Sequence, residues 1–360
     1  MSDKSHTSES SESQERPSRI RVWLAEMRAP FLTASITPVV LGTCIAWAST
    51  GVFIPEVFIL TLLAGIFIHV GSNVANDYYD HKSGTDDINV DFVRPFTGGS
   101  RMIQRGWMSP REVFVEAIVF FVLGGSIGFY LAYTRGWAIL ILGIIGVGSG
   151  FFYTAPPFRF VSRGFGEVFI GLNFGVLMTL GAYFVQTQVL AWEGVIASIP
   201  VAILITAVLY INEFPDFEAD KAVGKLTIVV RLGRRRAAKG YAILMIAVYL
   251  SIILPIVLNL TNWYTILGMA TIPAAALGMK HALAHHDHSL KLIPAYAATV
   301  VNHLLTGLFL SLSYVLIGLG QSPEFVLLWG IICLSIVLVF CFKTERQVKA
   351  AGTLPQGAVE

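Results

Sequence analysis

Carboxylate and amide side chains recur at helical spacing in two separate segments of the chain. The first segment carries, three or four residues apart, Asn73, Asn76, Asp77 and Asp80. The second carries, four residues apart, Asn212, Asp216 and Asp220. Residues at this spacing share one face of a helix. Each segment therefore predicts a row of oxygen ligands along one side of a helix end, and the likeness of the two segments suggests two related halves.

Oxygen ligands in this number indicate metal chemistry. Several carboxylates on facing helices would repel one another unless a cation neutralised them. Hard divalent cations take oxygen ligands, and Mg²⁺ in particular combines one or two carboxylates with the phosphates of a substrate. A single acidic cluster would be interpreted as solvated residues at the end of a helix. Two matched clusters instead predict a Mg²⁺ site that receives a diphosphate.

Basic residues near both clusters are candidates for binding that diphosphate. Together with Asn73, the candidates are Lys82, Arg94, Arg101, Lys221 and Lys225. Arginine suits bidentate contact with phosphate oxygens, and the glycines between Arg94 and Arg101 allow backbone N–H groups to approach an anion. The alternative for each is the ordinary positive charge of a cytosolic loop.

The elements that must position these residues are apolar. Hydrophobic residues make up 55% of the 360 positions and charged residues only 13%, more than one soluble core of this size could bury. Runs long enough to cross a bilayer lie near 29–49, 53–76, 112–133, 137–154, 165–187, 194–213, 241–259, 263–279, 292–318 and 323–342. The sequence thus predicts an all-α, multi-pass transmembrane bundle, and the net charge of +2 gives no reason to expect nucleic acid as a partner.

Basic residues are unevenly shared between the two sides of these spans. With the N-terminus in the cytosol, the cytosolic connections collect nearly all Lys and Arg, whereas the opposite connections hold only Arg135. This asymmetry predicts that both termini and both acidic segments lie on the cytosolic side of the cytoplasmic membrane. We expect a disordered tail over residues 1–22, a transmembrane domain over 23–320, an additional helix over 321–345 and a cytosolic tail over 346–360.

Residues 24–318 resemble the UbiA superfamily of intramembrane aromatic prenyltransferases, and within it the menaquinone-pathway branch that prenylates 1,4-dihydroxy-2-naphthoate. The resemblance depends on three stretches: Asn76-Asp-Tyr-Tyr-Asp80, Tyr153-Thr-Ala-Pro-Pro-Phe with Arg163-Gly-Phe-Gly-Glu167, and Asn212 through Asp220 with Ala222-Val-Gly-Lys-Leu-Thr-Ile-Val-Val-Arg-Leu-Gly233. The resemblance implies that the metal ligands are Asn76, Asp77, Asp80, Asp216 and Asp220.

The chain departs from the family pattern at two positions. Many relatives have a further Asp where this chain has Gly84, so either Asp86 or Asp87 would complete the first acidic site. Members that act on 4-hydroxybenzoate often carry Lys where this chain has Asn212, and the naphthoate branch has Asn there. The family has nine spans, so the run at 323–342 would be a tenth, peripheral helix.

The resemblance implies a central cavity, open to lipid for the polyprenyl tail and capped by the two acidic loops. Asp80 and Asp216 would hold the Mg²⁺ that withdraws charge from the leaving diphosphate, and Tyr153 would stabilise the allylic cation by a cation–π contact. The aromatic acceptor would capture this cation. Rival interpretations are a related enzyme for 4-hydroxybenzoate, a tetrapyrrole or a glycerol phosphate, and, from another class, an ion-coupled transporter.

Overall fold

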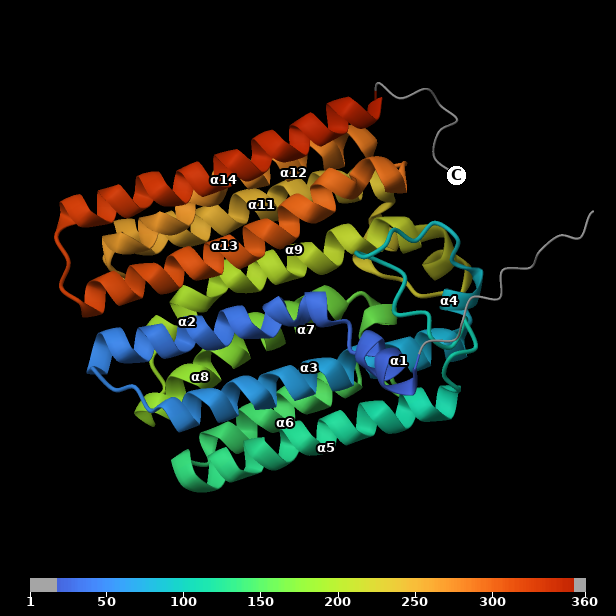
Figure 1. Cartoon of the computed structure of the whole chain (residues 1–360), viewed down its shortest axis with the longest axis horizontal. Coiled ribbons are helices and arrows are strands. Elements are labelled where there is room, and N and C mark those ends of the chain that lie inside the picture. Colours follow the sequence, from blue (N-terminus) through green and yellow to red (C-terminus); the bar gives the residue numbers. More distant parts are fainter. Residues whose placement is uncertain (1–17, 353–360) are drawn as a thin grey trace, which may run out of the picture.

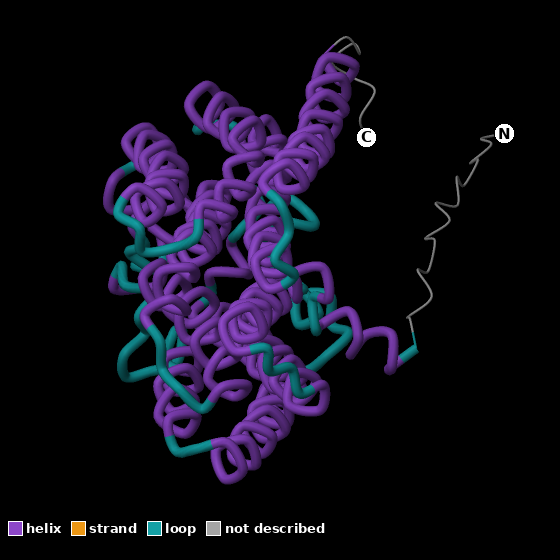
Figure 2. Tube along the Cα trace, turned by 90° about the vertical axis from the view of Figure 1, so that its left-hand side faces the viewer, coloured by secondary structure: helices purple, strands orange, loops and turns teal. Residues whose placement is uncertain are grey.

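The computed structural model describes residues 18–352, and in that part of the chain all regular structure is helical (Figures 1 and 2). Within residues 18–352, nine helical segments are long and apolar enough to span a membrane. The long helices are α2 (Thr33–Thr50), α3 (Pro55–Ser83), α5 (Pro110–Arg135), α9 (Trp192–Ala222), α11 (Arg234–Val257), α13 (Ile293–Gly318) and α14 (Pro323–Gly352). The all-α bundle predicted from the hydrophobic runs is therefore confirmed.

Besides the span in which η5 (Ser289–Leu292) continues into α13, two of the nine spans are composite. The first joins α7 (Gly166–Gly171), η3 (Leu172–Leu177) and α8 (Met178–Thr187), and η3 has π-helical geometry. The second joins the 3-10 helix η4 (Trp263–Thr271) to α12 (Ile272–His285). The span expected near 137–154 is the shorter α6 (Ala138–Phe151), which ends before the turns that contain Pro156 and Pro157. Because α6 has 14 residues, it falls below the length that normally crosses a bilayer.

Short helices gather at one end of the bundle. They are α1 (Arg19–Glu26), η1 (Ala29–Leu32), α4 (Thr85–Ile88), η2 (Val161–Arg163), α10 (Ile228–Leu232) and η5 (Ser289–Leu292). In Figure 1 this end lies at the right, where α4 and α1 lie next to the ends of α3 and α9. Most of the tail expected over residues 1–22 lies outside the described residues. Of the described part, residues from Arg19 onward belong to α1 and are therefore helical. At the other end, α14 extends to Gly352 and so includes residues expected to belong to the tail over 346–360.

Small residues allow α2 to pack closely against its neighbours. A Cβ atom at Gly42 of α2 would collide with the backbone of α8 at Thr179, and one at Gly307 of α13 would collide with Thr37 of α2. Close backbone approach through glycine is typical of helices that pack within membranes. The tight packing of α8, α2 and α13 joins the two halves of the bundle.

Local sequence signals fix the helix ends near the acidic segments. Gly84 adopts a φ of 82°, a left-handed conformation that suits glycine, and ends α3 just after Asp80. Ser109 and Glu112 form a capping box at the start of α5, each accepting a hydrogen bond from the other's backbone N–H. The segment between Gly84 and Ser109, which includes α4, folds back over the end of the bundle.

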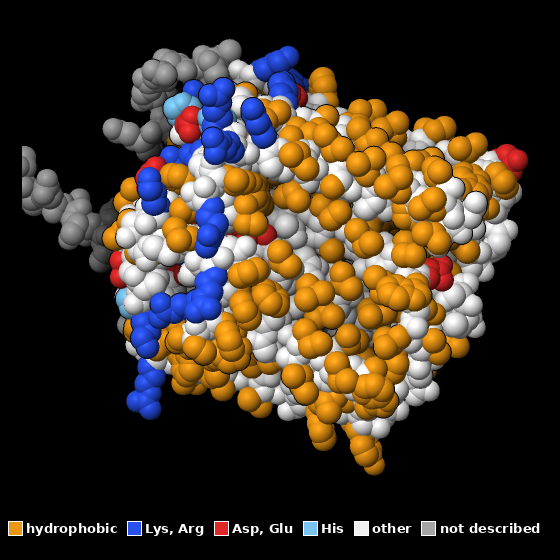
Figure 3. Space-filling view, turned by 180° about the vertical axis from the view of Figure 1, so that it is seen from behind, with side chains coloured by type: hydrophobic (Ala, Val, Ile, Leu, Met, Phe, Trp, Pro, Cys, Tyr) orange, Lys and Arg blue, Asp and Glu red, His pale blue; other side chains and the backbone are white. Residues whose placement is uncertain are grey.

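The outer surface is that of an integral membrane protein. Figure 3 shows hydrophobic side chains over most of one face, with Lys and Arg concentrated at the end that carries the acidic segments. Large exposed apolar side chains include Leu327, Ile331 and Val339 of α14. This helix packs on η4, α12 and α13, and Lys280 pairs with Glu345 of α14 at 2.6 Å. A lipid environment accounts for the exposed apolar surface.

Candidate active site

The ends of α3 and α9 face a common cavity of about 790 Å³. Asn76 and Asp80 come from α3, and Asn212, Asp216 and Asp220 come from α9. Although 136 residues separate Asp80 from Asp216 in the sequence, both carboxylates line the same wall. The structure therefore brings the two acidic segments together, as their placement on the same side of the membrane predicts.

Each acidic segment receives a polar partner from the loop of the other. Lys225, which follows α9, places its Nζ 3.2 Å from Asp80 Oδ2 at the end of α3 and 3.4 Å from Asp220 Oδ1. Asn89, which follows α4, donates a hydrogen bond from Nδ2 to Asp216 Oδ1 of α9 at 2.7 Å. These crossed contacts join the two halves at the mouth of the cavity.

Negative charge exceeds positive charge along this wall. The described lining includes two cations, Arg28 and Lys225, and five carboxylates, Asp80, Asp86, Glu213, Asp216 and Asp220. Burial disfavours the charged form of Lys225, but Asp220 and Asp80 outweigh it, so the pKa of the ammonium is raised well above its usual range. Burial first, and then the neighbouring Asp80, raises the pKa of Asp86 to about 8. A cation bound here would stabilise all these carboxylates in their ionised form.

Asp77 behaves differently from its neighbours in the first segment. Its Oδ2 accepts a hydrogen bond from the backbone N–H of Ser100 at 2.9 Å, and its Oδ1 lies 3.6 Å from a guanidinium nitrogen of Arg28. Gly99 adopts a φ of 66°, and a Cβ there would lie 2.8 Å from Asp77 Oδ1. Asp77 is not one of the described residues that line the cavity. It anchors the loop after α4 from behind the wall.

The candidate diphosphate-binding residues divide into two groups. Asn73 and Lys225 line the cavity, whereas four cations lie outside its described lining: Lys82, Arg94, Arg101 and Lys221. Arg94 donates to the backbone oxygen of Ser100, and Arg101 donates to the backbone oxygen of Asn89 at 3.4 Å. Lys82 and Lys221 are exposed and lie over the rings of Tyr78 and Phe217. Two of the four thus hold the backbone of the first loop in place.

Three functional candidates were not singled out from the sequence. Arg28 and Asn89 gave no signal, since an arginine beside a span resembles any cytosolic charge and a lone Asn resembles any loop residue. Glu213 is 5% exposed, and neither of its carboxylate oxygens has a hydrogen-bond partner among the described residues. Between the two loop carboxylates that the sequence left open, Asp86 lines the cavity, whereas Asp87 is half-exposed and pairs with His81.

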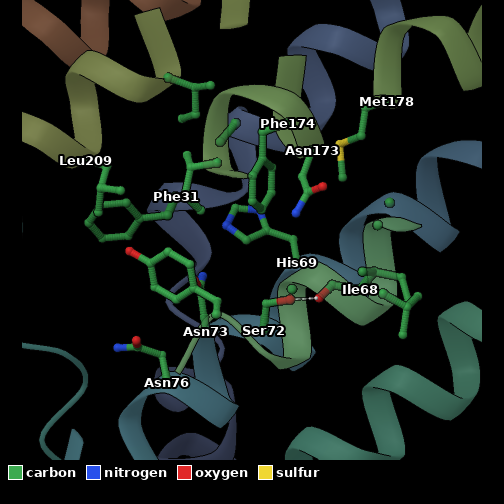
Figure 4. Close-up of a pocket in the computed structure, with 18 of the residues that line it drawn as sticks. Phe31, Ile68, His69, Ser72, Asn73, Asn76, Asn173, Phe174, Met178 and Leu209 are labelled. Carbon is green, nitrogen blue, oxygen red and sulfur yellow. Dashed lines mark hydrogen bonds between the residues drawn. The ribbon is translucent and has the colours of Figure 1, made fainter. Parts of the chain in front are cut away.

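Beyond the acidic end the cavity becomes apolar. Tyr153 lines it close to the carboxylates, and further lining comes from α5, α6 and α8. Figure 4 shows Phe31, Phe174, Met178 and Leu209 around this part of the cavity. An anionic head group can thus lie among the acidic and basic residues, while a hydrocarbon tail extends along the apolar walls.

The donor set fits a divalent cation that shares its coordination with a bound substrate. Among residues 18–352, no three or more His, Cys, Asp or Glu side chains form a group that could by itself hold a metal ion. Carboxylate and amide oxygens from α3 and α9 nevertheless converge on one space, and Asn212 Oδ1 is buried without a hydrogen-bond partner. Mg²⁺ retains several ligand positions for water or phosphate oxygens, so an incomplete protein cage suits it.

The site is thus a cavity within a bundle of membrane-length helices, with carboxylates and Lys225 at one end and apolar walls beyond them. The model of the UbiA prenyltransferase family matches residues 35–300, about three quarters of the chain. The chain belongs to this family and is a prenyltransferase, which decides against the transporter interpretation.

Individual relatives agree with this assignment. The chain is 28% identical to a 2-carboxy-1,4-naphthoquinone phytyltransferase of Synechocystis, over 84% of this chain and 96% of the relative. It is 30% identical to a 1,4-dihydroxy-2-naphthoate octaprenyltransferase of Mycobacterium tuberculosis, over 70% and 83%. A solved structure of a digeranylgeranylglyceryl phosphate synthase superposes with a TM-score of 0.52 at 18% identity, covering 84% of this chain and 99% of that one. The last likeness concerns the fold.

Proposed function

We propose that this enzyme transfers a polyprenyl group from a polyprenyl diphosphate to 1,4-dihydroxy-2-naphthoate in a Mg²⁺-dependent reaction. The observation that carries the proposal is the continuity of one cavity, acidic at the membrane face and apolar within the bundle. A diphosphate with a long hydrocarbon tail matches both parts. The relatives from Synechocystis and M. tuberculosis are named for naphthoquinone or naphthoate acceptors, which supports the choice of acceptor.

The carboxylates supply the metal-binding part of the site. Asp80, Asp216 and Asp220, with Asn76, would hold Mg²⁺. Asp77 would not contact the metal but would support the site through its contacts with Ser100 and Arg28. When bound, Mg²⁺ neutralises charge that develops on a leaving diphosphate. Lys225 lies between Asp80 and Asp220, where its ammonium can also contact a phosphate oxygen.

The reaction balances without an external base. The allylic C–O bond breaks and its electron pair leaves with the diphosphate. The carboxyl-bearing ring carbon of the acceptor forms the new C–C bond, and cleavage of the bond to the carboxylate releases CO₂ and restores the aromatic ring. Tyr153, in the cavity wall near Asp80 and Lys225, would face the allylic cation. The buried, largely apolar walls keep water away from that cation.

Asn212 favours a naphthoate acceptor over 4-hydroxybenzoate. Its side chain lines the cavity one turn before Asp216, and an amide cannot neutralise a carboxylate as an ammonium does. An acceptor that loses its carboxyl group during the reaction needs that pairing less. The same geometry leaves 4-hydroxybenzoate, a tetrapyrrole or a glycerol phosphate as the acceptors to test against it.

The test is an acceptor panel. Isolated membranes receive Mg²⁺, a polyprenyl diphosphate and one aromatic acid at a time, and products are identified by mass. We expect 1,4-dihydroxy-2-naphthoate to give a product lighter by CO₂ than simple addition would give. We expect 4-hydroxybenzoate to react at least about tenfold more slowly, equivalent to about 1.4 kcal/mol in the barrier. If 4-hydroxybenzoate were the better acceptor, the naphthoate proposal would be wrong although the enzyme class would stand.

We also propose that the acidic end faces the cytosol of a cell whose cytoplasmic membrane holds the protein. Lys and Arg gather at that end of the bundle, consistent with the positive-inside rule (Figure 3). In a variant without the native Cys44, Cys333 and Cys341, a cysteine at Asn262 should react with an impermeant reagent in intact cells, and one at Arg235 should not. The reverse labelling pattern would overturn this orientation.

A further inference from the structure

A second polar group lies in the cavity, further from the acidic end. His69 of α3 lines the cavity and is only 5% exposed. Its Nδ1 lies 2.7 Å from the Oγ of Ser35, a fully buried residue of α2. The imidazole and the ring of Phe174 pack edge to face, with 4.6 Å between ring centroids. These two contacts fix the orientation of the imidazole.

The fixed ring presents its free nitrogen to the cavity. Figure 4 shows His69 pointing into the open space between Phe31 and Phe174, with Asn73 one turn further along α3 and Asn173 on the neighbouring segment. Nδ1 is taken by Ser35, and Nε2 has no hydrogen-bond partner among the described residues. A buried polar atom that lacks a protein partner is costly unless a ligand or water contacts it.

The position of His69 along α3 suits an acceptor ring. It precedes Asp80 by eleven residues in one continuous helix, which corresponds to about 16 Å along the axis. A diphosphate held at Asp80 and Lys225 occupies the near end of this distance together with the allylic carbon. The attacked ring carbon must approach that carbon to about 3–3.5 Å. The remaining distance to His69 leaves room for the rest of a fused two-ring system.

We propose that His69, held by Ser35, hydrogen-bonds a ring hydroxyl of the aromatic acceptor and so orients the attacked carbon toward the prenyl chain. This inference rests on the proposed function and assigns the acceptor-binding part of the cavity. Ser35 acts through His69 and is a positioning residue. Phe31 and Phe174 flank the imidazole and supply the flat apolar walls that an aromatic ring requires (Figure 4).

A ring hydroxyl is a better hydrogen-bond partner for Nε2 of His69 than a carboxylate is. The Ser35 hydroxyl can either donate to Nδ1 or accept from it, so Nε2 of a neutral imidazole is either a donor or an acceptor. A ring hydroxyl satisfies both cases because it can also donate or accept. A carboxylate satisfies only the donor case, and the cations that line the described cavity, Arg28 and Lys225, contact carboxylates of α3 and α9.

The experiment separates acceptor binding from diphosphate binding in the purified full-length enzyme. We expect His69→Leu to raise the KM for the aromatic acceptor about tenfold and Ser35→Ala to raise it about threefold. The KM for the polyprenyl diphosphate should stay within about twofold in both variants, which also shows that they are folded. His69→Gln, whose amide can reach the position of Nε2, should recover part of the acceptor affinity.

The matched control lies on the same helix as Ser35. Thr43 is a buried hydroxyl of α2 that donates to its own helix backbone at Val39, 2.9 Å away, and does not belong to the described cavity lining. Thr43→Val should leave both KM values unchanged. An equal rise in both KM values for His69→Leu, or a Thr43→Val effect as large as that of Ser35→Ala, would show that these residues are merely structural.

A substrate analogue tests the contact itself. 1-Hydroxy-2-naphthoate lacks one ring hydroxyl of 1,4-dihydroxy-2-naphthoate, the diol. Its inhibition constant can be compared with the KM of the diol. If His69 contacts the missing hydroxyl, the native enzyme should prefer the diol by about tenfold more than His69→Leu does. The same comparison is made with 4-hydroxy-2-naphthoate, which lacks the other ring hydroxyl. Equal preference in both enzymes for both analogues would overturn the inference. A native enzyme that prenylates no aromatic acid would instead refute the proposed function, so the two failures are distinguishable.

Discussion

The two acidic segments are alike in sequence and different in surroundings. In α3, the carboxylate after Asn76 is Asp77, which turns away from the cavity and is held by Ser100 and Arg28. In α9, the carboxylate after Asn212 is Glu213, which lines the cavity and has no hydrogen-bond partner in the described part of the chain. Positions that correspond in the two similar segments thus differ in their surroundings, one anchoring a loop and one lying in the cavity wall.

The difference arises from the loops that follow each segment. The first loop continues through α4 to Ser109 and brings Asn89 to Asp216 of the other half. The second loop is short and brings Lys225 to Asp80. Each acidic segment is therefore completed by the opposite half. The described site therefore takes residues from both acidic segments and from both loops.

The largest expected effect comes from the carboxylates at equivalent positions of the two halves. Asp80→Asn and Asp216→Asn should each lower turnover by at least about two orders of magnitude, since each would remove a charged Mg²⁺ ligand of the proposed site. Chelation of Mg²⁺ should abolish turnover of the native enzyme, and Mg²⁺ should restore it. Normal Mg²⁺-dependent turnover in either variant would contradict the metal assignment, provided that the variant inserts into membranes at the native level.

Loss of the contact between Lys225 of the second loop and Asp80 should have the next largest effect on activity. Lys225→Met leaves Asp80 and Asp220 without their cation, and we expect kcat/KM for the diphosphate to fall about 30-fold. Lys221 offers a matched comparison because it lies four residues earlier and its ammonium is exposed. Lys221→Met should change kcat/KM by less than about threefold; comparable losses in the two variants would mean that bulk charge, and not the contact, is responsible.

Asp86 and Asp87, the adjacent carboxylates of the first loop, should differ in their effect on the affinity for Mg²⁺. Asp86→Asn should raise the half-saturating Mg²⁺ concentration about tenfold, because Asp86 is buried in the cavity wall. Asp87→Asn should leave it unchanged, since that side chain is half-exposed and paired with His81. Titration of both variants with Mg²⁺ measures the difference, and an equal shift in both would remove the distinction drawn from the structure.

The hydrogen bond from Asn89 of the first loop to Asp216 involves a neutral amide, so its loss should have the smallest effect on kcat/KM. Asn89→Ala removes one amide donor from Asp216, and we expect kcat/KM to fall about fivefold. A double-mutant cycle with Asp216→Asn should show coupling, because the two side chains are in direct contact. Additive effects would show that the contact contributes nothing to the site.

Much of the architecture follows from the sequence because bilayer thickness and the need to pair backbone groups leave few options. Runs of about 20 apolar residues can cross only as helices, so the all-α class, the order of the helices and the placement of both acidic segments at one end of the bundle could be predicted. The number of spans was wrong, because ten were expected and nine helices of the described residues have membrane-spanning length. The exception is α6, which ends at Phe151, whereas the apolar run suggested a longer span. That Asn76, Asp80, Asp216 and Asp220 line one cavity also follows from helical spacing, because it places Asn76 with Asp80 and Asp216 with Asp220. Their role as metal ligands stays a prediction.

Partners from distant parts of the chain were decided only by tertiary structure. Asn89 lies 127 residues from Asp216, and Lys225 lies 145 residues from Asp80, so no local pattern marks either contact. The orientation of Asp77 away from the cavity depends on the left-handed turn at Gly99, and the fixed ring of His69 depends on Ser35 in another helix. Periodicity along a helix states which residues share a face, whereas the packing of the helices decides what that face meets.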